Sequence, residues 1–271
     1  MKTYSHSKLS AFEQCKLKYK FRYIDNIIIV EKTVESFLGK IVHSALEWLY
    51  LEVRKGIVPT LDELIMHYAR EWRKEFDFEL IINGNLSIDD YYNKGIKFLA
   101  DYYIEYAPFD DNTIDIEKEI IINLDEEGKY RIRGFIDRLV YNLKTNSYEV
   151  HDYKTSNSIP SQEKIDSDRQ LALYSIAIKN LFGEDKDVLL VWHFLAYNQR
   201  VYSKRTNEKL KELKKEIIET IDRIESAKEF PPYVSKLCNW CEYKNICPGW
   251  GNSPDKEKRK REFNETLDVW D

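Results

Sequence analysis

The stretch from Thr113 to Lys154 alternates apolar and polar residues in three runs, and this alternation constrains the fold more than any other feature. The runs are TIDIEKEIIINL, KYRIRGFIDRLVYN and SYEVHDYKT, separated by the turn-forming sequences Glu-Glu-Gly and Lys-Thr-Asn-Ser. A period of two residues is typical of half-buried strands, and short polar connections favour antiparallel neighbours. The sequence therefore predicts a three-stranded antiparallel meander.

Segments with helical periodicity precede and follow this meander. Before it, apolar spacing predicts one helix over about residues 7–23, a second through GKIVHSALEWLYLEV, and two more in TLDELIMHYAREWRKEF and SIDDYYNKGIKFLADYYIEY. After it come the helix DSDRQLALYSIAIKNLF, the apolar strand DVLLVWHFLAY with a hairpin partner in RVYSKRT, and the charged helix NEKLKELKKEIIETIDRIESAKE. We expect an α/β protein whose mixed central sheet is flanked by helices.

The order of these elements predicts the domain organisation. We expect one domain over residues 1–271, with a helical insertion at 56–108, a cysteine-rich loop at 231–250 and a charged tail at 251–271. No run approaches the length of about 18 apolar residues that a membrane span requires. The N-terminus MKTYSHSKLS also lacks the apolar core of a signal peptide. We therefore expect a soluble, cytoplasmic protein without a membrane partner.

The formal charge of -5 argues against a protein that coats nucleic acid with a generally basic surface. Any contact with DNA must then be a local basic patch. The candidate patches are Lys16, Lys18, Lys20 and Arg22, the segment 204–215, and the segment 256–261. The commoner explanation of such runs is a solvated helix face, because 33% of all residues here are charged.

Three charged residues fall within the predicted strands. Asp137 lies among Phe, Ile, Leu and Val residues, where an ionised carboxylate costs several kcal/mol unless it is paired or binds a metal. Asp152 and Lys154 are two residues apart, so a strand directs both to the same side. A metal-binding carboxylate beside an ammonium group is suited to hydrolysis. The alternative for Asp152 and Lys154 alone is an ordinary surface ion pair.

Two helical pairs carry groups that could bind a metal or a substrate. His43 and Glu47 share one helix face, and the neutral imidazole of His43 would make a further metal ligand. The alternative for His43 is a hydrogen-bonded helix histidine without further function. Gln170 and Tyr174 repeat the four-residue spacing and could present an amide and a phenol to a phosphate or base, although such a pair is more often the edge of a core.

The four cysteines form a pattern of their own. Cys15 lies near the start, and Cys238, Cys241 and Cys247 follow the spacing C-x2-C-x5-C near the end. A disulfide is uncommon in a cytosolic chain, so we expect four thiolates around one metal site. Tetrahedral sulfur ligation suits either zinc or an iron–sulfur cluster, and the spacing alone leaves both open.

These motifs, in their order along the chain, resemble the RecB-like branch of the PD-(D/E)xK nuclease superfamily. The matching segments are SKLSAFEQCKLKYKFRY, GKIVHSALE, GFIDRL, HDYKTS and QLALY, so the resemblance covers most of the chain except the insertion and the tail. It implies a restriction-endonuclease-like core in a single nuclease domain. It also implies that His43, Asp137 and Asp152 bind Mg²⁺ or Mn²⁺.

The same resemblance assigns the remaining roles. Asp137, Asp152 and Lys154 would be catalytic, with Lys154 assisting the attacking water, and the helix that carries Gln170 and Tyr174 would help to hold DNA. An N-terminal cysteine followed by C-x2-C-x5-C is similar to the cluster-binding subgroup that includes the AddB helicase-nuclease protein and the CRISPR adaptation nucleases. This similarity implies a structural [4Fe-4S] cluster rather than zinc.

The resemblance implies a metal-dependent DNA nuclease, with exonuclease action on single strands or duplex ends. It also implies that a helicase or another repair or CRISPR adaptation protein is a partner. A second hypothesis is a catalytically silent DNA-binding module of the same fold, but such a module is expected to lose Asp137, Asp152 or Lys154, and all three are present. A third, an electron-transfer enzyme, lacks any nucleotide or flavin fingerprint.

Overall fold

The computed structural model describes residues 2–29, 33–76, 80 and 86–250. The chain divides into two compact units, the first made of residues 1–3 and 32–215 and the second of residues 4–31 and 216–271. The predicted charged tail at 251–271, with its basic run at 256–261, lies outside the described residues. The expectation of one domain with a helical insertion stays a prediction, and each unit is described by itself.

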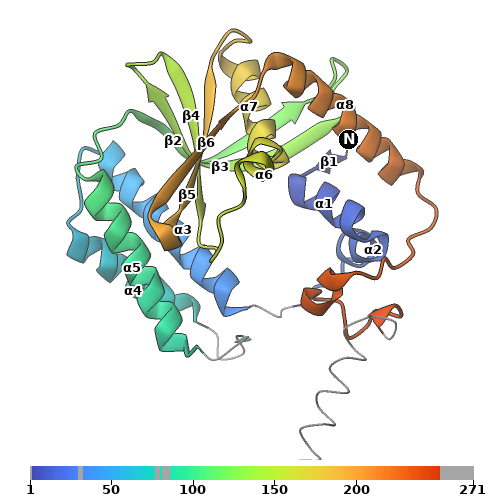
Figure 1. The fold of residues 1–271 in the computed structure, drawn as a ribbon, viewed down its shortest axis with the longest axis horizontal. Coiled ribbons are helices and arrows are strands. Elements are labelled where there is room, and N and C mark those ends of the chain that lie inside the picture. Colours follow the sequence, from blue (N-terminus) through green and yellow to red (C-terminus); the bar gives the residue numbers. More distant parts are fainter. Residues whose placement is uncertain (1, 30–32, 77–79, 81–85, 251–271) are drawn as a thin grey trace, which may run out of the picture. The chain divides into compact units, whose positions relative to one another are not determined.

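A mixed sheet forms the centre of the first unit (Figure 1). Its strands are β1 (Thr3–Tyr4), β2 (Thr113–Asn123), β3 (Arg131–Asn142), β4 (Ser147–Lys154), β5 (Val188–Phe194) and β6 (Gln199–Lys204). Strand β3 pairs antiparallel with β2 and β4, as the predicted meander requires. Strand β5 is parallel to β4, and β6 returns antiparallel to β5. The expectation of a mixed sheet flanked by helices is confirmed, and among the strands that the structure describes β1 alone was not predicted.

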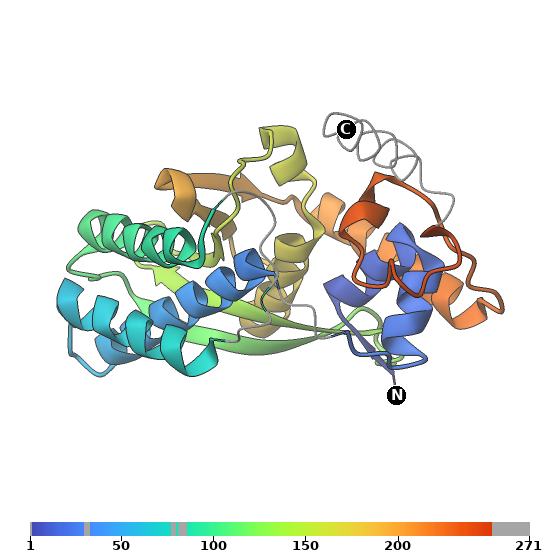
Figure 2. The same ribbon diagram turned by 90° about the horizontal axis from the view of Figure 1, so that it is seen from below.

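Three helices pack side by side as one layer, and they remain adjacent when the molecule is turned (Figures 1 and 2). They are α3 (Val34–Arg54), α4 (Leu61–Glu75) and α5 (Ile88–Tyr106). Thr60 and Ser87 begin α4 and α5 with complete capping boxes, which satisfy amide groups that the first turn leaves without partners. Leu46, Tyr68 and Leu99 are fully buried between the helices, so the layer has its own apolar core.

Helices cover both faces of the sheet in the first unit. Tyr153 of β4 makes edge contacts with His43 of α3 and Tyr102 of α5. Tyr148, on the opposite face of β4, stacks on Phe182 at the end of α7 (Arg169–Phe182). Asp168 caps the start of α7, and the short α6 (Gln162–Asp166), which the periodicity did not indicate, precedes it. Strand β4 is therefore held between two helical layers.

The second unit corrects the prediction of one helix over residues 7–23. The chain forms α1 (His6–Gln14) and α2 (Lys16–Tyr23), separated by Cys15, whose backbone is extended with φ -163° and ψ 117°. Cys15 still donates its N–H to Ala11 and accepts a hydrogen bond from the N–H of Tyr19. The break therefore leaves these backbone hydrogen bonds in place, and apolar spacing could not reveal it.

Two further elements contribute to the second unit. Helix α8 (Asn207–Ser226) begins in the first unit and ends in the second, and the 3-10 helix η2 (Lys236–Trp240) carries the first cysteine of the C-terminal motif. Tyr4 donates a hydrogen bond to Glu225, and Tyr243 donates one to the carbonyl oxygen of Ile27 at 3.0 Å. Segments from opposite ends of the sequence therefore build this unit.

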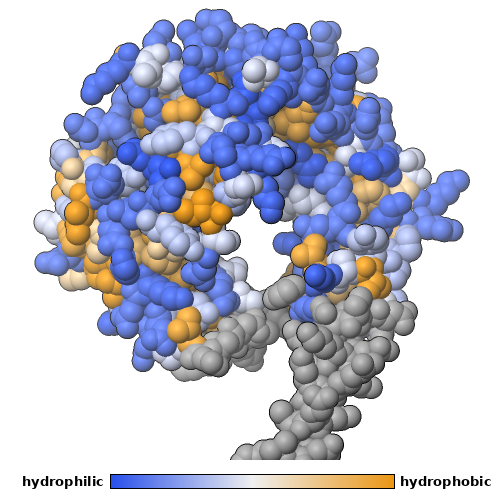
Figure 3. Space-filling model, viewed as in Figure 1, coloured by the Kyte–Doolittle hydropathy of each residue, from blue (hydrophilic) through white to orange (hydrophobic). Residues whose placement is uncertain are grey.

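Within the described part of the chain, no helix combines the length and the apolar character that crossing a bilayer demands. The face shown in Figure 3 is mostly hydrophilic, with hydrophobic residues in small patches. Scattered apolar residues of this kind are normal on a protein surface.

Gly95 gives a test of the helical layer. A Cβ atom there would lie 2.1 Å from Oη of Tyr68 and 2.9 Å from Cδ1 of Leu38, both in the buried core. Gly95→Ala should lower the free energy of unfolding by about 1–3 kcal/mol, because overpacking outweighs the better helix propensity of alanine. Urea unfolding measures this, with Asn93→Ala on the exposed face of α5 as the control, which should be neutral or stabilising.

Candidate functional site

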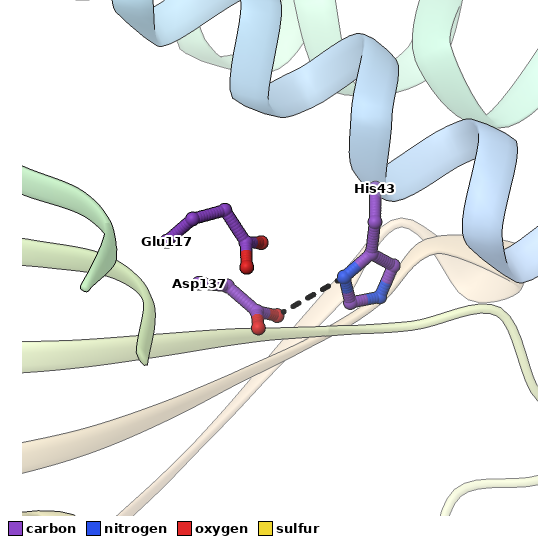
Figure 4. Close-up of side chains that lie close together, drawn as sticks. All are labelled: His43, Glu117 and Asp137. Carbon is purple, nitrogen blue, oxygen red and sulfur yellow. Dashed lines mark ion pairs between the residues drawn. The ribbon is translucent and has the colours of Figure 1, made fainter. Parts of the chain in front are cut away.

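Three side chains of the first unit bring possible metal ligands together. One ligand atom each from His43, Glu117 and Asp137 lies within 4.8 Å of the others, and no other such group of His, Cys, Asp or Glu occurs among the described residues. Figure 4 shows the three side chains pointing toward one another from α3, β2 and β3. They open into a groove of about 560 Å³, lined by Ser36, Gly39, Lys40, His43, Ser44, Glu47, Glu117 and Asp137.

His43 is oriented by the backbone of β4. Its Nε2 lies 2.8 Å from the carbonyl oxygen of Tyr153, which can only accept, so Nε2 carries the proton. In the neutral imidazole the lone pair is then on Nδ1, which lies 3.4 Å from Oδ2 of Asp137. One turn earlier, a Cβ atom on Gly39 would lie only 3.2 Å from Oγ1 of Thr155, so glycine favours the close approach of α3 to the end of β4. The free ring nitrogen therefore faces the carboxylates.

Glu117 lies opposite Asp137 in the β2–β3 pair, because the residues on either side of it, Ile116 and Lys118, pair with Arg138 and Ile136. Its φ of 45° is unusual for a strand residue that is not glycine, a conformation that tends to occur at functional sites. Partial burial, together with the carboxylates of Asp137 and Glu47, raises the pKa of Glu117 to about 7. The nearby His43 opposes this shift only in part.

This arrangement fits a divalent cation. Carboxylates are the ligands that Mg²⁺ or Mn²⁺ prefers in proteins, and a neutral imidazole is a common metal ligand. A hydrogen bond from the other ring nitrogen to a carbonyl, as His43 makes, is the usual way to fix the tautomer of a ligating histidine. A cation between Glu117 and Asp137 would replace their repulsion with attraction.

Asp152 and Lys154 point to the same side of β4, as their spacing predicts. Nζ of Lys154 lies 3.0 Å from Oδ1 of Asp152, to which it donates a hydrogen bond, and 2.7 Å from Oδ2. The geometry at Oδ2 does not make a hydrogen bond, so this buried oxygen keeps a lone pair available. Burial and the carboxylate of Asp137 raise the pKa of Asp152 to about 6, although Lys154 opposes the shift. Asp152 is not one of the three residues with ligand atoms within 4.8 Å.

Burial alone would lower the pKa of Lys154, but the carboxylates of Asp152, Asp137 and Asp168 outweigh burial and raise it. The ammonium form is therefore the stable form in the folded protein. A positive charge is therefore held beside the carboxylates of β3 and β4, where it could offset negative charge that develops in a reaction.

Tyr153 connects the two halves of this site. Its N–H donates to Oδ2 of Asp137 at 3.0 Å, and its carbonyl accepts from His43. Its phenol accepts a hydrogen bond from Nε of the fully buried Arg138 at 3.0 Å. The guanidinium of Arg138 also lies 4.2 Å from the ring centroid of Tyr50 and forms an ion pair with Asp111. A buried cation and its partners thus hold the residue on which both candidate ligands depend.

The histidines behind Arg138 belong to this network and not to the groove. Arg138 donates to Nδ1 of His151 at 3.0 Å, and the same nitrogen lies 2.8 Å from Nε2 of His193. Burial lowers the pKa of both imidazoles well below the usual value, so both are neutral and Nδ1 of His151 can accept. His151 lies on the opposite side of β4 from Asp152, as strand alternation requires.

Gln170 and Tyr174 lie on the first two turns of α7, where Nε2 of Gln170 donates to Oη of Tyr174 at 3.3 Å. A Cβ atom on Gly134 would lie 2.6 Å from the Tyr174 ring, so glycine in β3 is required for this contact. Burial and the carboxylates of Asp152 and Asp137 raise the pKa of Tyr174. The structure therefore brings this predicted pair to the edge of the carboxylate site, with its amide already bonded to the phenol.

All four cysteines line one cavity of the second unit, together with apolar residues such as Leu17 and Phe21. The N–H of Tyr233 donates to Sγ of Cys15 at 3.3 Å, and the N–H of Ser235 donates to Sγ of Cys238 at 3.4 Å. The break between α1 and α2 places Cys15 outside regular helix. Two of the four thiols thus accept backbone N–H···S bonds, although no three of these sulfur atoms lie within 4.8 Å of one another. Four thiols around one cavity are the residue types of a sulfur-ligated metal centre.

Ion pairs partly neutralise the predicted basic patches. Lys18 and Arg22 both pair with Glu242, and Lys20 pairs with Asp25. In the segment 204–215, Arg205 donates to the carbonyl oxygens of Ile165 and Asp168 and so fixes the loop before α7. These cationic side chains already have partners within the protein, which reduces the charge they could offer to DNA.

Glu117 is the residue that the sequence analysis missed. In TIDIEKEII it is one of several acidic residues on an alternating strand, and alternation groups it with the exposed Glu119. Counting the antiparallel register back from the turn would have placed it opposite Asp137. Glu47, predicted to share a helix face with His43, lines the same groove.

The chain is similar in sequence and in structure to known proteins. The family model of the PD-(D/E)XK nuclease superfamily matches residues 3–248. One of the subunits of the ATP-dependent helicase/deoxyribonuclease of Carboxydothermus hydrogenoformans is 26% identical over 244 residues, which cover 80% of this chain and 22% of that protein. The chain thus spans less than a quarter of the length of this relative.

Two solved structures are also similar. A protein of Eubacterium rectale provisionally described as an exonuclease shares 13% identity with a TM-score of 0.48, over 87% of this chain and 86% of that one. The structure of SSO0001 shares 18% identity with a TM-score of 0.36, over 78% of this chain and 94% of that one.

Glu117→Gln should stabilise the metal-free protein at high pH while weakening metal binding. The raised pKa means that the folded state binds more protons than the unfolded state between about pH 4.5 and 7, so the carboxylate costs stability as the pH rises through this window. In EDTA at pH 8, the Tm of the variant should exceed that of the native protein by about 2–4 °C for each 1 kcal/mol of repulsion removed. At pH 4 the two Tm values should be equal.

Manganese titration of the same variant completes this test, since loss of a carboxylate ligand should reduce the rise in Tm that Mn²⁺ causes. Glu127→Gln, at an exposed turn, makes the same charge change as a control. Equal Mn²⁺ responses in the native protein and Glu117→Gln would remove Glu117 from the candidate centre.

Proposed function

Because this chain belongs to the PD-(D/E)XK nuclease superfamily, we propose that it is a metal-dependent deoxyribonuclease that hydrolyses phosphodiester bonds. The observation that carries this proposal is the convergence of the His43 Nδ1 lone pair with the carboxylates of Glu117 and Asp137. Asp152 and Lys154 lie on the neighbouring strand. These side chains supply metal ligands, a buried carboxylate and an ammonium group for one hydrolytic reaction.

We assign the metal ligands to His43, Asp137 and Asp152, and add Glu117. Asp137 on β3 interacts with the charge of Glu117 on β2 and with the charge of Asp152 on β4. It is therefore the carboxylate that links the other two. A bound Mg²⁺ or Mn²⁺ would lower the pKa of a water molecule and offset charge on the phosphate. The chain itself fixes the tautomer of His43, and the main chain of Tyr153 holds both His43 and Asp137 in place.

Lys154 has the role of orienting the attacking water and offsetting transition-state charge. Its ammonium group is held against Asp152 at 2.7 Å, while 37% of its side chain remains exposed and can reach a substrate. Asp137, Asp152 and Lys154 are then the catalytic residues, and no covalent intermediate is needed. Gln170 and Tyr174, at the edge of the same site, contact the DNA backbone.

The substrate we propose is DNA with a free end, either a single strand or a duplex end, cut by exonuclease action. The curated relative belongs to a helicase/deoxyribonuclease, and by analogy the partner of this chain is a helicase or another protein of DNA repair or CRISPR adaptation. A catalytically silent DNA-binding module remains the second candidate. The presence of Asp137, Asp152 and Lys154 together favours the enzyme.

We further propose that Cys15, Cys238, Cys241 and Cys247 hold a structural [4Fe-4S] cluster, with zinc as the alternative at the same thiols. The apolar cavity that all four cysteines line and the N–H···S bonds to Cys15 and Cys238 support a sulfur-ligated centre. Its role would be to bind the N-terminal helices to the C-terminal motif within the second unit, because its ligands come from both.

Lys154→Ala should reduce DNA cleavage by about 100-fold or more, which is typical for loss of a group that acts on transition-state charge. The assay follows end-labelled single-stranded and double-stranded DNA with Mn²⁺ or Mg²⁺. Lys144→Ala, at an exposed turn before β4, is the matched control and should cleave normally. Equal cleavage by Lys154→Ala would refute its assignment, and no cleavage by the native protein under either metal would favour the DNA-binding module.

Cys15→Ala should lose visible-range absorbance and stability together, because one of four ligands is removed from the centre. Anaerobic purification followed by iron, sulfide and zinc analysis and thermal unfolding measures both changes. Stoichiometric zinc without iron in the native protein would show that the four thiols bind zinc and would refute the [4Fe-4S] cluster. Full retention of iron in Cys15→Ala would exclude Cys15 as a ligand.

A further inference from the structure

The β2–β3 surface next to the carboxylates bears two exposed apolar side chains. Phe135 is 44% exposed and Ile121 is 55% exposed. Phe135 precedes Asp137 by two residues on β3, so the pleat of the strand directs both side chains to the same face. An open aromatic ring therefore lies next to the proposed site of phosphodiester cleavage.

Neighbouring side chains hold this ring in place. The guanidinium carbon of Arg133 lies 5.2 Å from the centroid of the Phe135 ring, and Nε of Arg133 is 2.7 Å from Oε1 of Glu119 on the paired strand. Glu119 is directly opposite Phe135, and Ile121 is directly opposite Arg133. Arg133 thus occupies one side of the ring through a cation–π contact, and the exposed area of the ring is left for a second planar group.

We propose that Phe135 is a stacking site for one unpaired nucleobase of the DNA strand whose phosphate lies at Asp137. This inference rests on the proposed nuclease function and specifies its substrate. Inside a regular duplex both faces of each base are covered by the neighbouring bases of the stack, so no face is free for a protein ring. A base that stacks on Phe135 must therefore have left the stack of a duplex, which favours a single strand or a frayed end.

The position of Phe135 favours a nucleobase over other occupants. Aromatic rings that line single-strand channels stack on bases without regard to sequence, as a nuclease that degrades any sequence requires. Two exposed apolar side chains make a small patch, whereas surfaces that bind protein partners expose larger contiguous apolar areas. The competing explanation is that Phe135 only stabilises the hairpin through cross-strand contacts.

A double-mutant cycle, which combines one change in the protein with one change in the DNA, separates base stacking on Phe135 from mere stabilisation of the hairpin. Single-stranded oligonucleotides with one abasic position, moved stepwise along the strand, are cleaved with Mn²⁺ by the native protein and by Phe135→Ala. At one position, loss of the base should slow the native protein by about fivefold or more, the lower end of base–aromatic stacking. Phe135→Ala should lose this sensitivity and cleave both oligonucleotides at similar, low rates.

Phe135→Trp should restore the sensitivity because it restores a ring, and Ile121→Ala should keep it because it removes apolar area without removing the ring. A Phe135→Ala variant that unfolds at lower temperature but keeps the sensitivity of the native protein would overturn the stacking site, as would a native protein that tolerates the abasic site at every position. Either result would leave the nuclease function intact.

A binding measurement keeps the two proposals distinct if the native protein does not cleave. The fluorescent base 2-aminopurine, placed at successive positions of the same oligonucleotide, should be quenched on binding at one position, and Phe135→Ala should abolish that quenching. Quenching without cleavage would support the stacking site and refute the nuclease function. Absence of quenching in the native protein would refute the stacking site.

Discussion

The main chain of Tyr153 is the link on which the rest of the candidate site depends. One peptide N–H holds Asp137, and the carbonyl of the same residue holds His43. Side chains from β3 and α3 are thus positioned against β4 by backbone groups, which cannot change rotamer. The phenol on the other side of the residue is buried against Arg138, so a displacement of β4 would disturb a buried charge as well as the candidate ligands.

The candidate site combines groups that would destabilise an ordinary fold. Burial, followed by the charges of nearby carboxylates, raises the pKa of both Glu117 and Asp152. Glu117 also has a backbone conformation that strand residues rarely adopt. The apolar core of the helical layer and the capping boxes of α4 and α5 stabilise the first unit and so offset these costs. Instability is concentrated where a cation would relieve it.

Much of this site was predictable because the responsible patterns are local. The spacing of Asp152 and Lys154 fixes their common direction, and helical spacing relates Gly39 to His43 and Gln170 to Tyr174 in the same way. Glu117 depends instead on the register between two strands and on a positive φ, neither of which alternation reveals. Arg138 resembles any other charged residue of a strand, and its burial depends on Tyr50, Asp111 and His151, which are distant in sequence.

The same distinction explains the errors in the predicted elements. Residues 7–23 keep their apolar periodicity across Cys15, so the pattern predicts one helix where the structure has two. The break becomes meaningful only with Cys238, Cys241 and Cys247 in the same cavity, since these residues are far away in the sequence. Helix α6 was not predicted because it has only five residues, which are too few to show a helical period.

The second unit contains segments from both ends of the described chain, and this has a consequence for folding during synthesis. Tyr4 and Ile27 leave the ribosome before the central sheet, but their partners Glu225 and Tyr243 emerge only after the sheet has been made. Contacts of such long sequence separation form late and close large loops. The apolar faces of α1 and α2 therefore stay uncovered until the C-terminal partners have been synthesised. A growing chain is most prone to misassembly during this time.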